Sequence, residues 1–152
     1  MPNKFVLDEN VIISASTFKD ENCIDDYSSS TLLNLIACNG HSLLVTQEIY
    51  SRYIKQYHKL VEEKKAFTDI AIKILTSMMA SGKIVYENYC EIDLPEQNYH
   101  RKDDCFIKLA MNKNSIVATL DNSLIDDIKE NEIDITYHFE IKRPSDAHVD
   151  AS

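Results

Sequence analysis

Short apolar runs alternate along the chain with longer segments in which apolar residues recur every three or four positions. Runs with the length and composition of buried strands occupy 4–7, 42–45, 83–86 and 115–120, and residues 133–138 read as a last strand. The segments between them predict helices, because their apolar positions share one helical face. This alternation is typical of the α/β class, with a doubly wound, three-layer parallel sheet flanked by helices.

Local signals place several helix ends. Helices are expected at 10–16, around 32–36, from Thr46 to about Lys64, and at 67–81, 103–111 and 123–130. Thr46 is a favourable N-cap, and Gly40 and Gly82 suit the position just after a helix. Polar loops are expected at 17–26 and 87–102.

Length and charge set the broad class. A chain of 152 residues suits one domain, which we place at 1–141, followed by a frayed tail at 142–152. No segment resembles a signal peptide or a membrane helix, so a cytoplasmic location without a membrane partner is expected. The net charge of -9 argues against a general basic surface for nucleic acid, so any such contact must be local, metal-mediated or helped by a partner.

Four acids fall where ligands bind to open α/β sheets. Asp8 and Asp121 end predicted strands, and Asp103 and Glu48 lie in the first turns of predicted helices. Two carboxylates about 5 Å apart repel by roughly 3 kcal/mol at an effective dielectric near 20, so such a cluster favours a divalent cation. Oxygen ligands alone select Mg²⁺ or Mn²⁺.

Each acid also has a purely structural explanation. Glu48 and Asp103 suit first helical turns because of capping and the helix dipole, and an Asp at a strand end can cap or form a turn. The scattered histidines form no nucleophile-base arrangement, and no phosphate-binding glycine loop is present.

The sequence resembles the PIN-domain nucleases, single-domain ribonucleases that include toxins of toxin-antitoxin pairs. The matching segments are "FVLDENVIISAS", "LLVTQEIYSRY" and "RKDDCFIKLAMNKNSIVATLDNSLI", which with the element order span most of residues 4–138. The resemblance implies a doubly wound sheet and a metal-dependent endoribonuclease site. It implies that Asp8, Asp103 and Asp121 are catalytic acids and metal ligands, and that Asn10 orients the Asp8 carboxylate.

The chain departs from the family pattern at the second acid. The usual Glu aligns with Arg52, and Glu48, four residues earlier on the same helical face, either replaces the missing carboxylate or pairs with Arg52. Arg52 and Lys55 are candidate RNA-binding residues, the alternative for Lys55 and for Lys59 being a solvated, salt-bridged helix face. Glu9 is expected to face solvent.

The leading hypothesis is therefore a Mg²⁺- or Mn²⁺-dependent ribonuclease acting on RNA, with a toxin role as a further step. Candidate protein partners are an antitoxin and a second copy of the chain in a homodimer. A second hypothesis is a PIN-fold module that binds RNA or protein with impaired chemistry. A phosphatase or receiver-type phosphoacceptor using Asp8 ranks last, because receiver domains need a late Lys where this chain has Asp121.

Overall fold

The structure is a computed structural model of the chain. It describes residues 2–92, 94, 101–112 and 114–152, without the side chain of Arg101. The predicted loop at 87–102 thus lies partly outside the described residues.

Five parallel strands form one sheet in the order β3-β2-β1-β4-β5. The strands are β1 (Lys4–Leu7), β2 (Ser42–Val45), β3 (Ile84–Tyr86), β4 (Ile116–Ala118) and β5 (Glu140–Lys142). The chain builds outward from β1 through β2 to β3, then returns to place β4 on the other side of β1. The winding therefore reverses between β1 and β4, where open α/β sheets bind their ligands.

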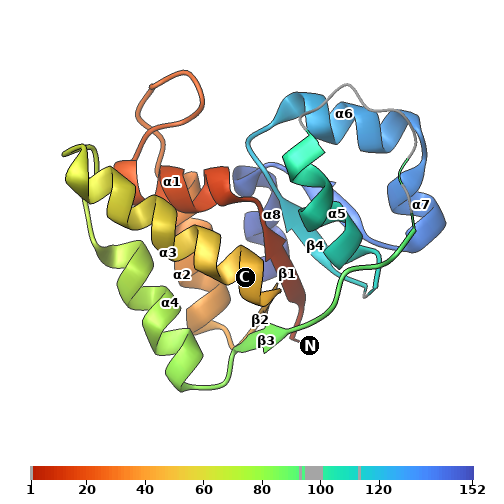
Figure 1. The fold of residues 1–152 in the computed structure, drawn as a ribbon, viewed down its shortest axis with the longest axis horizontal. Coiled ribbons are helices and arrows are strands. Elements are labelled where there is room, and N and C mark those ends of the chain that lie inside the picture. The colour runs from red at the N-terminus through yellow and green to blue at the C-terminus, as the bar shows by residue number, and fades with distance from the viewer. Residues whose placement is uncertain (1, 93, 95–100, 113) are drawn as a thin grey trace.

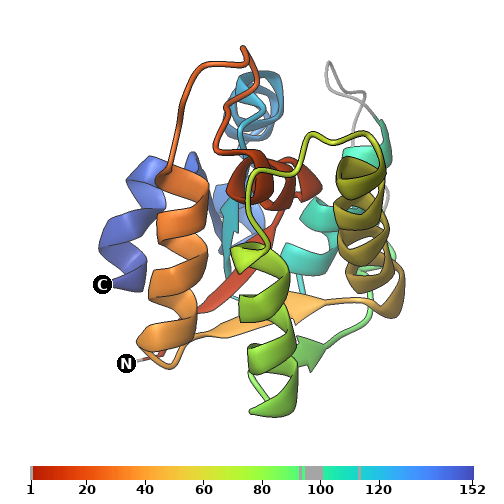
Figure 2. The same ribbon diagram turned by 90° about the vertical axis from the view of Figure 1, so that its left-hand side faces the viewer.

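Helices flank the sheet in a three-layer, doubly wound arrangement, as Figure 1 and Figure 2 show. They are α1 (Glu9–Thr17), α2 (Ser28–Cys38), α3 (Gln47–Glu62), α4 (Ile70–Ala80), α5 (Asp104–Ala110), α6 (Asn122–Glu130), α7 (Ile133–Tyr137) and α8 (Pro144–Ala151), with a 3-10 turn, η1 (Arg101–Asp103), before α5. Helices α1 to α4 group on one side of the strands in Figure 1, and α5 to α7 lie on the other. The α/β class predicted from the sequence is confirmed.

The central strand is buried on both faces. Phe5, Val6 and Leu7 of β1 are all 0% exposed. Parallel strands covered by helices on both sides read as uninterrupted apolar runs, which explains the apolar stretch before Asp8. The chain leaves the core of the sheet at Asp8 and enters α1 directly.

Several helix ends follow their predicted local signals. Thr46 caps α3, and its Oγ1 accepts a hydrogen bond from the Ile49 N–H at 3.0 Å. Gly40 and Gly82 lie beyond the ends of α2 and α4 with a φ of 74°, a left-handed conformation that glycine adopts without a Cβ penalty. These predicted ends are confirmed.

The prediction of a last strand at 133–138 is wrong. Residues 133–137 form α7, and the residues that flank it, Glu132 and His138, both have positive φ. The fifth strand lies later, at β5, where Ile141 is 2% exposed. The β-branched residues of α7 favour a strand locally, but the packing of Ile141 into the sheet decides which segment pairs with β4.

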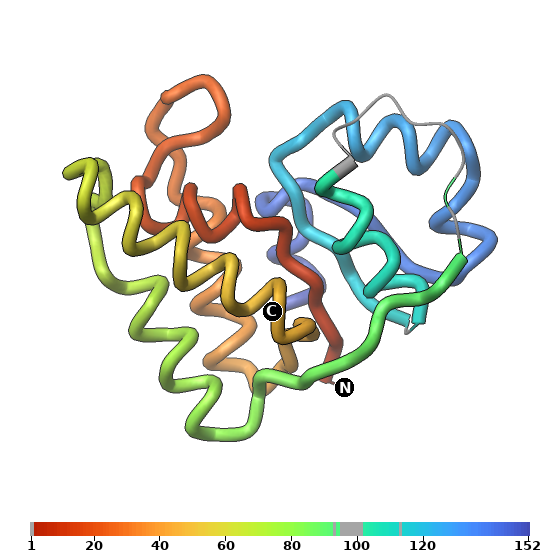
Figure 3. Tube along the Cα trace, viewed as in Figure 1, coloured from red at the N-terminus to blue at the C-terminus, as the bar shows by residue number. Residues whose placement is uncertain are grey.

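The predicted frayed tail at 142–152 is also wrong. Lys142 belongs to β5, and α8 packs on α2 with Ala147 and Ala151 fully buried. Figure 3 shows the two chain ends near each other, and Asn3 Nδ2 donates a hydrogen bond to the Asp150 carbonyl at 2.9 Å. The C-terminal segment is therefore part of the packed structure.

Candidate functional site

Asp8 lies at the winding reversal between β1 and β4. It directly follows β1, and its backbone N–H donates to the Ala118 carbonyl of β4 at 3.0 Å. Although Asp8 occupies the N-cap position of α1, its side chain makes no capping hydrogen bond, and the residue is only 2% exposed. The carboxylate is therefore buried at the carboxyl edge of the sheet.

Two side chains orient the Asp8 carboxylate. Its Oδ2 accepts hydrogen bonds from Thr119 Oγ1 at 2.8 Å and from Asn10 Nδ2 at 3.3 Å. Asn10 is itself held, because its Oδ1 accepts from the Leu120 N–H at 3.2 Å. The orienting position expected for Asn10 agrees with this geometry. Thr119 was not singled out from the sequence, where the available signal is a hydroxyl residue between a buried strand and Asp121.

Burial raises the pKa of Asp8 from 3.8 to about 7, and the negative charge of Asp103 is the next largest cause. The hydrogen bond from Thr119 acts in the opposite direction. The contribution of Asp103 means that the two carboxylates, from opposite halves of the chain, are close enough to repel. A cation bound between them would relieve that repulsion.

The other strand-end acid is engaged differently. Asp121 Oδ1 accepts a hydrogen bond from the Leu124 N–H at 3.2 Å and caps α6, the structural role considered for an acid at this position. Asp103 ends η1 and occupies the N-cap position of α5. Within the described part of the chain, no three His, Cys, Asp or Glu side chains are grouped so that they could hold a metal ion. The structure thus brings Asp103 near Asp8 without assembling the expected three-acid set.

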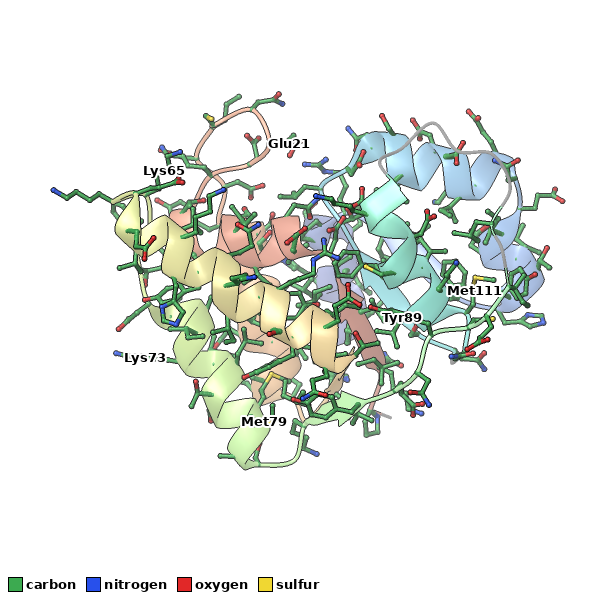
Figure 4. The ribbon with its side chains drawn as sticks, viewed as in Figure 1. Glu21, Lys65, Lys73, Met79, Tyr89 and Met111 are labelled. Atoms are coloured by element: carbon green, nitrogen blue, oxygen red, sulfur yellow. The ribbon has the colours of Figure 1, made fainter. Side chains whose placement is uncertain are left out.

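Glu48 lies in the first turn of α3 and is exposed. Its carboxylate accepts a hydrogen bond from the Tyr89 hydroxyl at 3.4 Å, and the same hydroxyl pairs with Thr46 Oγ1 at 3.0 Å. Figure 4 shows Tyr89 on the segment that follows β3. Glu48 therefore contacts Tyr89, whereas the ion-pair partner of Arg52 is Glu9.

Arg52, at the position of the expected second acid, is fixed by three contacts. Its guanidinium forms an ion pair with Glu9 and donates a hydrogen bond to Cys105 Sγ at 3.2 Å. The guanidinium carbon also lies 5.3 Å from the centroid of the Phe106 ring. The side chains of Arg52 and Glu9 are 22% and 21% exposed, so the expectation that Glu9 faces solvent is wrong. The Arg52 guanidinium is thus held in one position in a largely buried environment.

A cleft of about 990 Å³ opens between α3 and α5. Its cationic residues are Arg52, Lys55, Lys59, Lys102 and Lys108, and its acids are Glu9, Glu48 and Asp104. Lys55, Lys59 and Lys108 form no ion pair with any residue that the structure describes, which disfavours a salt-bridged helix face. We call this feature the cationic cleft. Asp8 and Asp103 do not line it, but their chain neighbours Glu9 and Asp104 do.

Comparisons with protein-family models, with curated proteins and with solved structures find no match to this chain. Over the described ranges, no helix has both the length and the apolar character needed to cross a membrane. The function must therefore be inferred from the chemistry of the site itself.

Proposed function

We propose that this protein is a metal-dependent endoribonuclease of the PIN type, which hydrolyses RNA phosphodiesters. The observation that carries the proposal is the buried Asp8 carboxylate at the winding reversal, with Asp103 close enough to raise its pKa. Burying one carboxylate beside another destabilises a fold, so such a pair is most often retained for function. The adjacent cationic cleft offers phosphate contacts in a chain that is otherwise acidic.

The donor set favours Mg²⁺ or Mn²⁺, because the acids offer only oxygen ligands. Asp8 and Asp103 fit as the first two ligands, since a divalent charge would offset their repulsion. Asp121 is the third proposed ligand, because its capping hydrogen bond uses Oδ1 alone. Glu48, on the wall of the cationic cleft, is the remaining proposed acid. When bound, the ion would supply an activated water and stabilise charge on the phosphate.

The protein's own cations would position the RNA. Arg52 uses two of its five N–H donors on Glu9 and Cys105, which leaves the others for a phosphate oxygen. Lys55 and Lys108 would hold neighbouring phosphates as point charges. Asn10, meanwhile, keeps the Asp8 carboxylate in one orientation.

RNA cleavage in the presence of Mg²⁺ or Mn²⁺ tests the proposal. We expect Asp8→Asn to lower the cleavage rate by roughly 100-fold or more, as removal of a key electrostatic group does in other enzymes. Asp126→Asn, which changes an exposed acid on α6, is the matched control and should cleave like the wild type. Equal rates for Asp8→Asn and the wild type would remove the proposed site.

A toxin role is a finer proposal that rests on the resemblance to PIN-domain toxins. Induced expression of the wild type should then arrest bacterial growth, whereas expression of Asp8→Asn should not. Co-expression of a candidate antitoxin protein should restore growth. Unimpaired growth under wild-type expression would argue against this role while leaving the ribonuclease proposal open to the cleavage test.

A PIN-fold module that binds RNA or a protein partner without cleaving RNA is the second candidate. The observation that favours it is the Glu9–Arg52 ion pair at the position of the expected second acid. RNA binding that persists in EDTA, with no cleavage in either Mg²⁺ or Mn²⁺, would assign this function. Metal-dependent cleavage that is lost in Asp8→Asn would exclude it.

A further inference from the structure

A second groove, of about 610 Å³, extends from the Asp8 region between α1 and α3. The α1 residues that line it are Asn10, Ile13, Ser14 and Thr17, and the α3 residues are Gln56, Lys59, Leu60 and Glu63. Leu120 lines one end of the groove. This end lies near Asp8, because the Leu120 N–H donates to Oδ1 of Asn10, which contacts Asp8. Phe67 lines the other end, because its N–H donates to the carbonyl of Ser16 at 2.8 Å, near the end of α1. We call this feature the apolar groove.

The apolar groove is continuous with the cationic cleft. Gln56 and Lys59 of α3 line both. Lys59 forms no ion pair with any described residue, so its charge is available where the two features meet. A polymer with phosphates in the cationic cleft could therefore place the next side group in the apolar groove.

Exposed aromatic rings lie at the far end of the groove. Phe67 is 77% exposed, although its backbone is tied to α1. The Phe18 ring packs against it with 5.4 Å between the ring centroids, and Tyr27 packs on Phe18 in turn. A fixed aromatic ring that faces solvent is the usual platform for an unpaired nucleobase.

One polar group without a partner among the described residues also lines the groove. Ser14 is 1% exposed, and its Oγ has no hydrogen-bond partner among the described residues. Its neighbours Ser16 and Thr17 instead donate to the carbonyls of Ile12 and Ile13. A buried hydroxyl left without a partner is destabilising, and it indicates a ligand that can supply one. The edge of a nucleobase carries such donors and acceptors.

Three acids line the groove, and two of them form ion pairs. Glu21 pairs with Arg143 at 3.0 Å, and Glu63 pairs with Lys65 at 3.1 Å. The third, Asp20, accepts hydrogen bonds from the backbone N–H groups of Asn22 and Ile24 at 2.8 and 3.0 Å. Figure 4 marks Glu21 on the loop after α1 and Lys65 beyond the end of α3. Lys59, where the groove meets the cationic cleft, supplies the positive charge that an anionic backbone needs at that end.

We propose that the apolar groove binds one unpaired nucleobase of a single-stranded RNA whose phosphates lie in the cationic cleft. This inference rests on the proposed function, and it names the substrate class as RNA with a flexible, unstacked nucleotide beside the cleavage point. A base in a duplex is stacked and paired, so it cannot enter the groove. The volume of about 610 Å³ lies within the range of small-molecule sites, so the groove is large enough for one nucleoside.

Binding of short fluorescein-labelled single-stranded RNAs, measured by fluorescence anisotropy in EDTA, tests the inference without cleavage. An abasic nucleotide at one position of the RNA should weaken wild-type binding roughly tenfold. Phe67→Ala should weaken binding of the intact RNA by a similar factor and remove the sensitivity to the abasic position. Ile135→Ala on α7, which changes an apolar side chain that is 67% exposed, is the matched control and should bind like the wild type.

Ser14→Ala provides a second probe, because it removes the unpartnered hydroxyl with little change in volume. It should alter the relative affinities for RNAs that differ only in the bound base, while thermal stability stays equal to that of the wild type or rises. Equal affinity of intact and abasic RNAs at every position would overturn the groove proposal, and the ribonuclease proposal would survive if cleavage persists. Wild-type protein that binds none of these RNAs would overturn both.

Sedimentation of the wild type and of Phe67→Ala tests whether a second copy of the chain fills the groove instead of RNA. A monomer at all concentrations supports a groove open to RNA. A wild-type dimer that Phe67→Ala dissociates would assign the groove to a second copy of the chain and overturn the proposal.

Discussion

Asp8 is held at the edge of the sheet at the expense of stability. Because its pKa rises to about 7, the folded chain binds the Asp8 proton more tightly than the unfolded chain does. The contribution of Asp8 to the free energy of unfolding should therefore fall as pH rises from about 4 through 7, and the full loss should be present above pH 7. Asn in place of Asp8 cannot ionise and escapes this loss.

Asp8→Asn should accordingly raise the free energy of unfolding at pH 8 in EDTA, by at most about 4 kcal/mol for a pKa shift of this size. Thermal denaturation at several pH values should show this advantage shrinking as pH falls toward 4. Mn²⁺ should narrow the gap at pH 8, because a cation that binds the folded wild type stabilises it. Asp126→Asn is the control and should follow the wild type. An Asp8→Asn protein less stable than the wild type at pH 8 would contradict the argument.

The Glu9–Arg52 ion pair is the other unusual feature at the residue scale. Both side chains are about four-fifths buried, so their attraction is screened less than that of a surface pair. A double-mutant cycle of Glu9→Gln and Arg52→Met, followed by urea denaturation, should give a coupling energy of about 1 to 2 kcal/mol. The exposed i,i+4 pair Asp69–Lys73 is the matched control and should give about 0.5 kcal/mol or less. Equal coupling in the two cycles would mean that Arg52 is not fixed by Glu9.

At the scale of elements, the sequence predicts structure best where the signal is local. The strand at β2 and the Thr46 cap follow from adjacent residues, and both agree with the structure. The position of Asp8 at the end of a strand could be predicted for the same reason, because the apolar run of β1 stops at the residue before it. The partner of Arg52 could not be predicted, because Glu9 lies in a distant helix and only the packing of α1 against α3 brings them together.

The C-terminal elements were predicted wrongly because long-range packing determines them. Residues 133–138 carry β-branched side chains that favour a strand, yet β5 forms later because its alternating pattern fits beside β4. Pro144 is a local signal for the start of α8, because proline suits the first turn of a helix. The rest of the segment has no apolar stripe that would predict a helix. Helix α8 is stabilised by its packing on α2, a long-range contact that the local sequence does not predict.

His41 should contribute to the docking of α8. Its Nδ1 accepts from the Asn3 N–H at 2.8 Å, so the opposite nitrogen, Nε2, carries the proton and donates to the Ala151 carbonyl at 3.1 Å. His41→Ala should lower the free energy of unfolding by about 1 to 3 kcal/mol, because it leaves the Asn3 N–H without its acceptor. The Ala151 carbonyl still accepts a hydrogen bond from Asn39 Nδ2 at 2.6 Å. Hydrogen exchange should accelerate in α8 more than in α6. His58→Ala, at an exposed site on α3, should change neither. Unchanged exchange in α8 would show that other contacts hold the helix.

At the scale of the whole molecule, the winding reversal brings the acids, the cationic cleft and the apolar groove to one edge of the sheet. Asp8 and Thr119 come from the ends of adjacent strands, while α3 and α5 supply the cations. The net charge of -9 would repel RNA from most of the surface. Binding therefore depends on the few lysines that the cationic cleft concentrates.

The salt dependence of RNA binding measures how many phosphates the lysines of the cationic cleft contact. Each phosphate contact to single-stranded RNA contributes about 0.7 to the slope of log affinity against log salt concentration. Replacing Lys55, Lys59 and Lys108 with Gln should lower the slope by about 2. Replacing Lys4, Lys83 and Lys129, which do not line the cationic cleft, changes the net charge equally and should leave the slope nearly unchanged. Equal slopes for the two triple variants would mean that RNA senses only the total charge, and the cationic cleft would then not be the binding site.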